Sequence, residues 1–407
     1  MIGSETESGA GPFCGLLRSR VRGIGNVLCF GLAYNFHLMK FFSVLRRFIL
    51  RLVLVAAPVL LPAADGADTQ TVYTFKRGVN ISHWLSQNDA KQPYGAAWFE
   101  EKDVAWIAAQ GFDHIRYPID GRLWLRADGS LDEEKIAPFV RALAWTRAHG
   151  LGAILDMHFL PGADFNPGAE QREVFTNDNL LARVADFWAR AARRFAGEGD
   201  YLRFELLNEP VADKNDQLNR FNRRMLAAIR ESNPTRMVYI TANRWSIFGN
   251  VGDIELPADP HVAITLHFYE PMLFTHQRTW WTKFPANMPA IKFPGKVPDL
   301  TGFVPADHYA YRPAGFELTA KTIDEAFDKV AAWAAKNAPG REIHLGEFGV
   351  YVAADADSKR NYISVIMANT ARHGWSWAIW DYRDVFGVRD AEGRGTPILE
   401  ALSLPKK

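Results

Sequence analysis

From about residue 72 onward, short apolar runs alternate with longer amphipathic stretches, and this alternation limits the folds open to the chain. The apolar runs predict strands at residues 75–82, 112–118, 152–158, 202–208, 237–242, 262–267, 342–346 and 375–380. The amphipathic stretches predict helices at residues 97–110, 132–149, 177–196, 215–232, 322–337 and 357–373, with a short closing helix at 397–402. The strands are continuously apolar, which is typical of parallel strands buried on both faces.

Repeated strand–helix units favour right-handed crossovers and a parallel sheet. Eight such units predict a closed (β/α)8 TIM barrel of the α/β class, formed as a single domain by residues 68–407. A doubly wound open sheet is the structural alternative, but no glycine-rich dinucleotide loop follows the first strand. Residues 268–318 form the longest irregular stretch, and a loop of that length in a compact domain is usually a lid or the wall of a groove.

The composition is that of a soluble globular protein, with 48% hydrophobic and 23% charged residues among 407. The formal net charge of +1 gives no field that would favour a nucleic acid or a stable membrane partner, so neither is expected. The 13 tryptophans exceed what a core needs and leave some for a carbohydrate groove, where aromatic faces stack on sugar rings.

The N-terminal region has the pattern of a secretory signal peptide. A basic segment at residues 39–47 precedes an apolar run at 52–61 and small residues at 63–67, so cleavage is expected near 64–67 and the mature protein is expected to be secreted or periplasmic. An uncleaved signal anchor is the alternative. We expect Met39 to be the true start, so that residues 1–67 comprise an upstream segment and the signal peptide. Both cysteines, Cys14 and Cys29, lie upstream of Met39, so the mature chain would have no thiolate for catalysis or metal binding.

Two glutamates follow apolar runs directly. Glu209 stands in Leu-Leu-Asn-Glu-Pro (206–210), and Glu347 stands in His-Leu-Gly-Glu-Phe-Gly (344–349). Either glutamate alone could simply be solvated. In a barrel, however, the carboxyl ends of all strands meet at one mouth, where chemistry is located. Two carboxylates that converge there suit glycoside hydrolysis, in which one donates a proton and the other attacks or activates water.

Other polar and aromatic side chains also end the predicted strands. Each of them could make only a structural hydrogen bond, but together they indicate one site. They are Asn80, His83, Arg116, His158, Asn208, Asn243, His267, Tyr269 and Trp380.

Several of these residues lie in motifs that resemble glycoside hydrolase family 5, the cellulase-type retaining hydrolases. The motifs are Gly-Val-Asn-Ile (78–81), Phe-Asp-His-Ile-Arg-Tyr-Pro (112–118), Asn-Glu-Pro (208–210), His-Phe-Tyr (267–269), Gly-Glu-Phe-Gly (346–349) and Trp-Ala-Ile-Trp (377–380). They occur in the expected order over nearly the whole mature chain. The stretch 267–277, with Phe-Thr-His-Gln at 274–277, is similar to the bacterial endoglucanase branch of the family.

The resemblance implies a (β/α)8 barrel that cleaves β-1,4-linked glucan by double displacement, with Glu209 as acid/base and Glu347 as nucleophile. It implies that Arg116 and Tyr269 keep Glu347 ionised and aimed, that Asn208 holds the 2-hydroxyl of the reacting sugar, and that Trp380 is a stacking floor. His267 would lie near Glu209, and His158 would line the reacting-sugar site. The full expected substrate-binding set is Asn80, His83, Arg116, His158, Asn208, His267, Tyr269, His276 and Trp380.

One position departs from the family pattern. Phe159 follows the third strand where some relatives have a second histidine, so a hydrogen-bond donor is lost there and the hydroxyl preference of the site is open. A β-mannanase, or another β-glucan hydrolase of the same family, therefore remains an alternative, and the sequence does not decide between endo and exo action.

Two further classes are alternatives. The histidines 158, 267 and 276 with the two glutamates could bind zinc, but no His-x-x-x-His pair on a helix supports this, and we expect neither a metal nor a cofactor. A carbohydrate-binding protein without activity would need the aromatics but not two opposed carboxylates. The expected partner is a polysaccharide or oligosaccharide substrate, and the expected state is a monomer.

Overall fold

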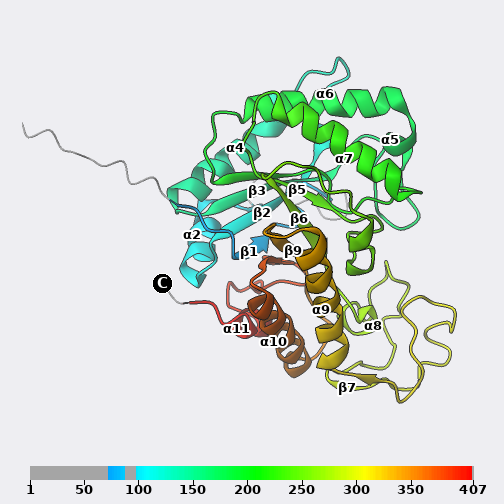
Figure 1. Ribbon diagram of the computed structural model, residues 1–407. Helices are drawn as coiled ribbons and strands as arrows, with labels where there is room; N and C mark the ends of the chain where they lie inside the picture. The colour runs from blue at the N-terminus through cyan, green and yellow to red at the C-terminus, as the bar shows by residue number, and fades with distance from the viewer. Residues whose placement is uncertain (1–71, 88–97, 406–407) are drawn as a thin grey trace, which may run out of the picture. The chain divides into compact units, whose positions relative to one another are not determined.

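The strands of the computed structural model, which describes residues 72–87 and 98–405, close into a parallel barrel in the order β1-β10-β9-β6-β5-β4-β3-β2 (Figure 1). The barrel strands are β1 (Arg77–Asn80), β2 (His114–Asp120), β3 (Gly152–Phe159), β4 (Leu202–Glu205), β5 (Val238–Thr241), β6 (Val262–His267), β9 (Ile343–Glu347) and β10 (Ser376–Ile379). The predicted single-domain (β/α)8 barrel is confirmed, and every predicted strand is present, with β1, β4, β5 and β10 two to four residues shorter than expected.

The predicted helices are also present around the barrel. They are α2 (Glu101–Gln110), α4 (Glu133–Ala148), α6 (Asp178–Arg194), α7 (Asn215–Arg230), α9 (Ala320–Asn337), α10 (Ala356–His373) and α11 (Pro397–Ala401). Four short helical elements of the described residues were not predicted: α3 (Gly121–Trp124), α5 (Glu173–Thr176), η2 (Phe248–Asp253) and α8 (Met272–Thr275). Capping residues fix where the long helices begin. The side chain of Asn177, for example, accepts the backbone N–H groups of Asn179 and Leu180 at the start of α6.

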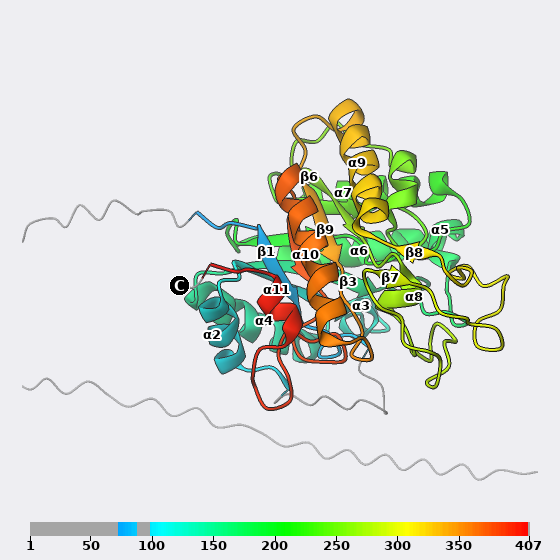
Figure 2. The same cartoon turned by 90° about the horizontal axis from the view of Figure 1, so that it is seen from below.

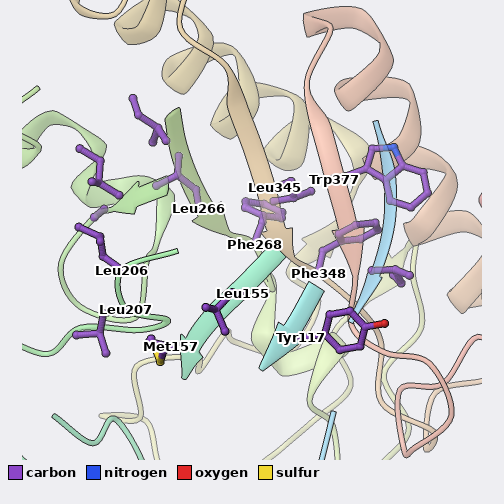
Figure 3. Close-up of a cluster of buried hydrophobic side chains, with 14 of the residues drawn as sticks. Tyr117, Leu155, Met157, Leu206, Leu207, Leu266, Phe268, Leu345, Phe348 and Trp377 are labelled. Carbon is purple, nitrogen blue, oxygen red and sulfur yellow. The ribbon is translucent and has the colours of Figure 1, made fainter. Parts of the chain in front are cut away.

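Apolar side chains fill the space between the barrel and its helices, and part of this core is shown in Figure 3. Leu155, Leu266 and Leu345 come from three different strands and are completely buried. Their continuous burial explains why the strands read as uninterrupted apolar runs in the sequence.

The N-terminal end of the barrel is closed by hydrogen-bonded side chains around Glu342. Its carboxylate accepts from Arg203 at 2.8 Å, from Tyr239 at 2.9 Å and from Ser376 at 2.8 Å. The Arg203 guanidinium also lies 3.7 Å from the centre of the Phe75 ring. These groups satisfy one another's hydrogen bonds, so this end of the barrel contributes to stability. Active sites of such barrels lie at the opposite end, at the carboxyl ends of the strands.

Residues 268–318 form a packed layer and not an open loop. Beside α8 they contain a two-stranded antiparallel sheet, β7 (Gly295–Lys296) with β8 (Glu317–Leu318), which lies with α8 at one edge of the barrel in Figure 2. Buried apolar side chains hold the segment together, namely Phe274, Phe284, Met288, Ile291, Phe293, Val297 and Leu300. The sequence correctly indicated an irregular segment, and its first residues reach the barrel mouth, where the Tyr269 hydroxyl donates to Glu347 at 3.0 Å.

Residues 1–71, which include the expected signal peptide and the domain boundary at 68, lie outside the described residues. Among the described residues, no helix has both the length and the apolar character that crossing a membrane requires.

Candidate active site

A buried arginine forms the base of the site at the carboxyl ends of the strands. Arg116 on β2 is completely buried, and its Nη1 atom lies 2.8 Å from both Glu347 Oε1 and Asn80 Oδ1. Its Nη2 atom donates to Asn208 Oδ1 at 2.7 Å, and its other edge makes a two-point ion pair with Glu205 at 2.7 and 2.8 Å. A buried charge is tolerated only when it is paired, and here every guanidinium nitrogen has a partner.

Glu347 ends β9 and receives two hydrogen bonds that favour its charged form. Besides the bond from Arg116, the Tyr269 hydroxyl donates to Oε2 at 3.0 Å. Burial raises the pKa of Glu347, and the Arg116 guanidinium opposes that rise.

Glu209 lies beside Glu347, and no lysine or arginine of the described residues forms an ion pair with it. Burial and the negative charge of Glu347 raise the pKa of Glu209 well above its usual range. The His267 Nδ1 atom lies 2.8 Å from Glu209 Oε1, and burial lowers the pKa of His267 well below its ordinary value. We therefore place the proton of a neutral His267 on Nδ1, where it donates to Oε1 and leaves Oε2 for the proton of a carboxylic acid. The environments of the two carboxyl groups thus differ, because Glu347 has a guanidinium and a hydroxyl as donors and Glu209 has a histidine.

The separation of the two carboxyl groups is short. One oxygen from each of Glu209 and Glu347 and one nitrogen of His267 all lie within 4.8 Å of one another. Retaining glycosidases hold their carboxyl groups about 5–5.5 Å apart and inverting ones about 6.5–9.5 Å apart, and the close approach of these two oxygens is compatible with the shorter separation.

This triad of side chains has a spacing that could also hold a metal ion. Its electrostatics argue against a resident cation, because the Arg116 guanidinium already lies 2.8 Å from Glu347 and the Nδ1 atom of His267 is used by Glu209.

His158 and Trp380 form an aromatic pair at the mouth. Their rings stack at 5.7 Å with an interplanar angle of 8°, and the His158 Nδ1 atom lies 2.7 Å from Asp156 Oδ2. Burial lowers the pKa of His158 to about 3, so its imidazole is neutral and its Nε2 atom lies 3.5 Å from Asn208 Nδ2. His83 meets the Trp380 ring edge-on, with 6.4 Å between ring centres, and its Nε2 atom lies 3.2 Å from Asp384 Oδ2.

Two residues expected to bind substrate lie behind the site. The amide nitrogen of Asn80 lies 3.0–3.2 Å from three backbone carbonyls and its oxygen accepts from Arg116, so this completely buried side chain supports the arginine. His276 is buried and packs edge-on behind Tyr269, with 4.9 Å between ring centres, so it buttresses the tyrosine.

Asn243 was expected at the mouth with the other strand-end residues. Its side chain instead donates to the carbonyl of Ala212 at 2.9 Å and to Asn215 Oδ1 at 3.0 Å, which ties two loops together.

Two carboxylates of the site were not predicted. Asp156 and Glu205 are completely buried and face Arg116, with an Asp156–Arg116 separation of 3.1 Å. Burial raises the pKa of each to about 7, and the guanidinium opposes this. A charged residue inside an otherwise apolar strand is the signal that could have indicated a buried ion pair.

Phe159, where a second histidine was missing from the family pattern, belongs to an apolar stack. Its ring lies 5.0 Å from Phe165 at an angle of 7°, and the Arg122 guanidinium lies 4.4 Å from the ring centre. Phe159 has no polar side-chain atom and is 1% exposed, so this position supplies neither a hydrogen-bond donor nor an acceptor at the mouth.

A closed (β/α)8 barrel with two opposed carboxyl groups at its mouth defines a glycoside hydrolase that acts on O-glycosyl bonds. The family model described as "Cellulase (glycosyl hydrolase family 5)" matches residues 74–385, and the chain therefore belongs to that family.

The chain is similar in sequence to proteins that are named as an endoglucanase and a cellodextrinase. The chain is 29% identical over 320 residues to Endoglucanase C of Acetivibrio thermocellus, a match that covers 76% of this chain and 92% of that one. It is 28% identical to Cellodextrinase A of Ruminococcus flavefaciens, over 74% and 83% of the two chains. Among solved structures, one titled "endoglucanase" superposes with a TM-score of 0.64 at 25% identity, over 81% of this chain and 96% of the other. Thermotoga maritima Cel5A in complex with mannotriose superposes with a TM-score of 0.65 at 22% identity, over 81% and 97%, which shows the shared fold.

Proposed function

We propose that this protein is an endo-β-1,4-glucanase that works by double displacement, with Glu347 as nucleophile and Glu209 as acid/base. The observation that carries the proposal is the asymmetry between the two glutamates. Arg116 and Tyr269 both donate to Glu347, whereas Glu209 has a neutral histidine as its partner. Glu347 is therefore the group that is ionised at neutral pH and Glu209 the group that holds a proton.

In the first step, a carboxylate oxygen of Glu347 attacks the anomeric carbon as the bond to the leaving oxygen breaks. Glu209 gives its proton to that oxygen, so the leaving sugar departs as a neutral alcohol. In the second step, Glu209 accepts a proton from water, and the water oxygen displaces Glu347 from the anomeric carbon. Both glutamates then return to their starting protonation states, and two inversions give net retention.

Neighbouring side chains offer contacts for the reacting sugar. The Asn208 oxygen accepts from Arg116, which leaves its Nδ2 group near the His158 ring to donate to a sugar hydroxyl. We assign the 2-hydroxyl to this donor. The Trp380 ring, backed by the parallel His158 ring, supplies the apolar face for stacking.

A series of contacting rings connects Tyr269, through the buried His276, with the protein surface and favours a long substrate. His276 lies behind Tyr269, the Trp281 ring lies 6.2 Å from His276, and the exposed Trp280 follows at 5.8 Å from Trp281. Trp280 is 81% exposed, the most exposed large aromatic side chain among the described residues. Aromatic groups at such positions give a polysaccharide further sugar-stacking surfaces beyond the bond that is cleaved.

The names of the relatives support a glucan substrate, since they include endoglucanases and a cellodextrinase. Mannan is the second candidate. The Cel5A structures of Thermotoga maritima are titled as complexes with both cellobiose and mannotriose, and Phe159 presents no polar atom that would discriminate between the hydroxyl epimers.

Product analysis on β-1,4-glucan, mixed-linkage β-1,3/1,4-glucan and β-1,4-mannan tests the substrate. We expect internal cleavage of β-1,4-glucan, seen as a rapid fall in viscosity with few new reducing ends, and at least tenfold lower turnover of mannan. Proton NMR of the first products should show the β anomer. Faster turnover of mannan would overturn the substrate assignment, and an α product would overturn the nucleophile assignment.

We also propose that the chain is exported through the leader at residues 39–67 and acts as a monomer outside the cytoplasm. The basic, apolar and small-residue segments of the leader support export, and the site is built from side chains of one chain. Intact mass of the protein from its host should give a mature N-terminus near residue 68. Light scattering on that protein should give the mass of one chain.

A further inference from the structure

A short turn after β5 has an unusual backbone. Arg244, Trp245 and Ser246 have φ angles of 58°, 62° and 58°, so three consecutive non-glycine residues lie in the left-handed region. Such residues rarely adopt this region, and they persist there only when the surrounding structure determines their conformation. We call residues 244–246 the left-handed turn.

The left-handed turn holds the backbone on both sides of Glu209. The Ser246 hydroxyl donates to the carbonyl of Asn208 at 2.6 Å, and the backbone N–H of Trp245 donates to the carbonyl of Pro210 at 3.2 Å. Asn208 and Pro210 are the two neighbours of Glu209 in the chain. Ser246 is completely buried, so water does not compete for this hydrogen bond.

The same turn also holds the side-chain partner of Glu209. The Ser246 carbonyl accepts the backbone N–H of His267 at 2.9 Å, and the His267 ring in turn lies 2.8 Å from Glu209 Oε1. Ser246 therefore bonds through its side chain to the residue before Glu209, and through its backbone to the histidine that contacts the carboxyl group.

The turn is itself fixed from several directions. Asn243 Oδ1 accepts the N–H of Arg244 at 2.9 Å, and the side chain of Asn243 anchors to Ala212. The indole N–H of Trp245 donates to the carbonyl of Phe165 at 3.1 Å, and Phe165 contacts the His158 ring. These bonds compensate the unfavourable backbone conformation and make the turn a rigid support.

We propose that Ser246 is a positioning residue for proton transfer by Glu209, with the left-handed turn as its scaffold. The proposal rests on the proposed role of Glu209 as acid/base. Without the Ser246 hydroxyl, the carbonyl of Asn208 has no donor from the turn, and the carboxyl group of Glu209 is less well aimed at the leaving oxygen. A misaimed acid slows substrates whose leaving group needs the proton and spares those whose leaving group departs as a stable anion.

The test compares Ser246→Ala and Ser246→Gly with wild type on aryl β-glycosides of the sugar that the substrate panel identifies. The aryl leaving groups are chosen to span weakly to strongly basic phenolates. We expect kcat/KM for the most basic leaving group to fall about tenfold and kcat/KM for dinitrophenolate to stay within about twofold. Both variants should therefore show a steeper dependence of kcat/KM on leaving-group basicity than wild type.

Ser246→Gly separates positioning from stability. Glycine adopts positive φ freely, so this variant loses the hydroxyl without adding backbone strain, and its melting temperature should fall less than that of Ser246→Ala. Thr370→Val is the matched control, because Thr370 is a buried hydroxyl on α10 that donates to the carbonyl of Met367. It should lose stability with no change in leaving-group dependence.

Equal losses on all leaving groups, or a wild-type dependence in Ser246→Gly, would overturn the positioning role while the glycosidase assignment stood. Glu209→Ala serves as the reference and should show the steepest dependence of all. If Glu209→Ala showed no such dependence, the acid/base assignment and the positioning role would both be wrong.

Discussion

The Nη1 atom of Arg116 lies 2.8 Å from Oε1 of Glu347, although the two residues are 231 positions apart in the chain. The same guanidinium pairs with Glu205 and contacts Asp156, so one cation faces three carboxylates. The charge on Glu347 is therefore stabilised by a fixed group inside the barrel, and the cost of solvent reorganisation during the reaction is reduced.

The pH dependence of Tyr269→Phe tests the electrostatics of Glu347. The Tyr269 hydroxyl donates to the carboxylate, so its removal disfavours the charged form and raises the pKa of Glu347 further. Because kcat/KM requires an ionised Glu347, the acidic limb of the pH profile should move to higher pH by about half a unit to one unit. At the pH optimum, kcat/KM should fall about tenfold to a hundredfold.

Tyr362→Phe is the control for this prediction. Its buried hydroxyl donates to the carbonyl of Glu270 at 3.1 Å, so the variant loses a comparable hydrogen bond away from the carboxylates. It should leave the acidic limb in place. A Tyr269→Phe profile that fell in height without moving would contradict the proposed effect on Glu347.

Much of the fold could be predicted from the sequence because parallel barrel strands are buried on both faces and therefore read as apolar runs. Glu209 and Glu347 could be found because strand ends converge at one mouth in this fold. Glu347 was expected as a partner of Arg116, but Asp156 and Glu205 were not, because the sequence does not say which cation on another strand each of them pairs with. That pairing depends on the register between the adjacent strands β2, β3 and β4, which no local pattern encodes.

The left-handed turn could not be predicted for a different reason. Arg244, Trp245 and Ser246 include no glycine, so the usual sequence signal for positive φ is missing. The turn donates hydrogen bonds to Asn243 Oδ1, which precedes it, and to the carbonyls of Pro210 and Asn208, which belong to another loop, and these bonds impose the conformation. Asn80 and His276 also stand at the expected end of the barrel. The side chain of Asn80, however, is hydrogen-bonded to neighbouring groups, and the ring of His276 is covered by packing.

Asp381→Asn should change how stability depends on pH. Burial and the charge of Asp384 raise the pKa of Asp381 to about 7, whereas an unfolded aspartate titrates near 3.9. The folded state thus keeps a proton that the unfolded state releases, so the stability from this group is present below about pH 4 and is lost as the pH rises to about 7.

Removing this titration should flatten the unfolding free energy over that range by up to about 1.4 kcal/mol per pH unit. Urea unfolding at several pH values measures the slope. Asp132→Asn is the contrasting variant, because a hydrogen bond from Arg126 lowers the pKa of Asp132. This substitution should change the slope of the unfolding free energy against pH only below about pH 4. An unchanged slope in Asp381→Asn between pH 4 and 7 would contradict the prediction.

Trp280 and Trp281 should contribute to the binding of long substrates only. Trp281→Ala and Trp280→Ala each remove an aromatic surface at the outer end of the ring series, so KM for cellohexaose should rise about fivefold to tenfold, equivalent to about 1–1.4 kcal/mol. The turnover of cellotriose should stay within about twofold of wild type. Tyr309→Ala, an exposed aromatic of the same segment outside the ring series, should leave both substrates unchanged. Equal KM effects on the two oligosaccharides would contradict an outer binding surface.

Metal chelation distinguishes the two-carboxylate mechanism from metal-assisted hydrolysis. Arg116 already supplies the positive charge beside Glu347, so dialysis against EDTA should leave kcat/KM within experimental error. Loss of activity that returns with added zinc would support a metal bound by Glu209, His267 and Glu347.

Azide rescue assigns the roles of the two glutamates separately. Glu347→Ala removes the nucleophile, so no glycosyl–enzyme forms and kcat should fall by about four orders of magnitude or more. Azide fits the vacated space and attacks the anomeric carbon directly on an activated β-glycoside. A single inversion then gives the α-glycosyl azide, which proton NMR identifies.

Glu209→Ala should give the opposite anomer. A good leaving group departs without a proton, so Glu347 still forms the glycosyl–enzyme, but water attacks it slowly because no base is present. Azide needs no base and should attack the accumulated intermediate, and two inversions give the β-glycosyl azide. A burst of phenolate release before the slow steady state should accompany this product. If both variants gave the same anomer, the division of roles between Glu209 and Glu347 would be wrong, because only a nucleophile and an acid/base in these two positions produce opposite products.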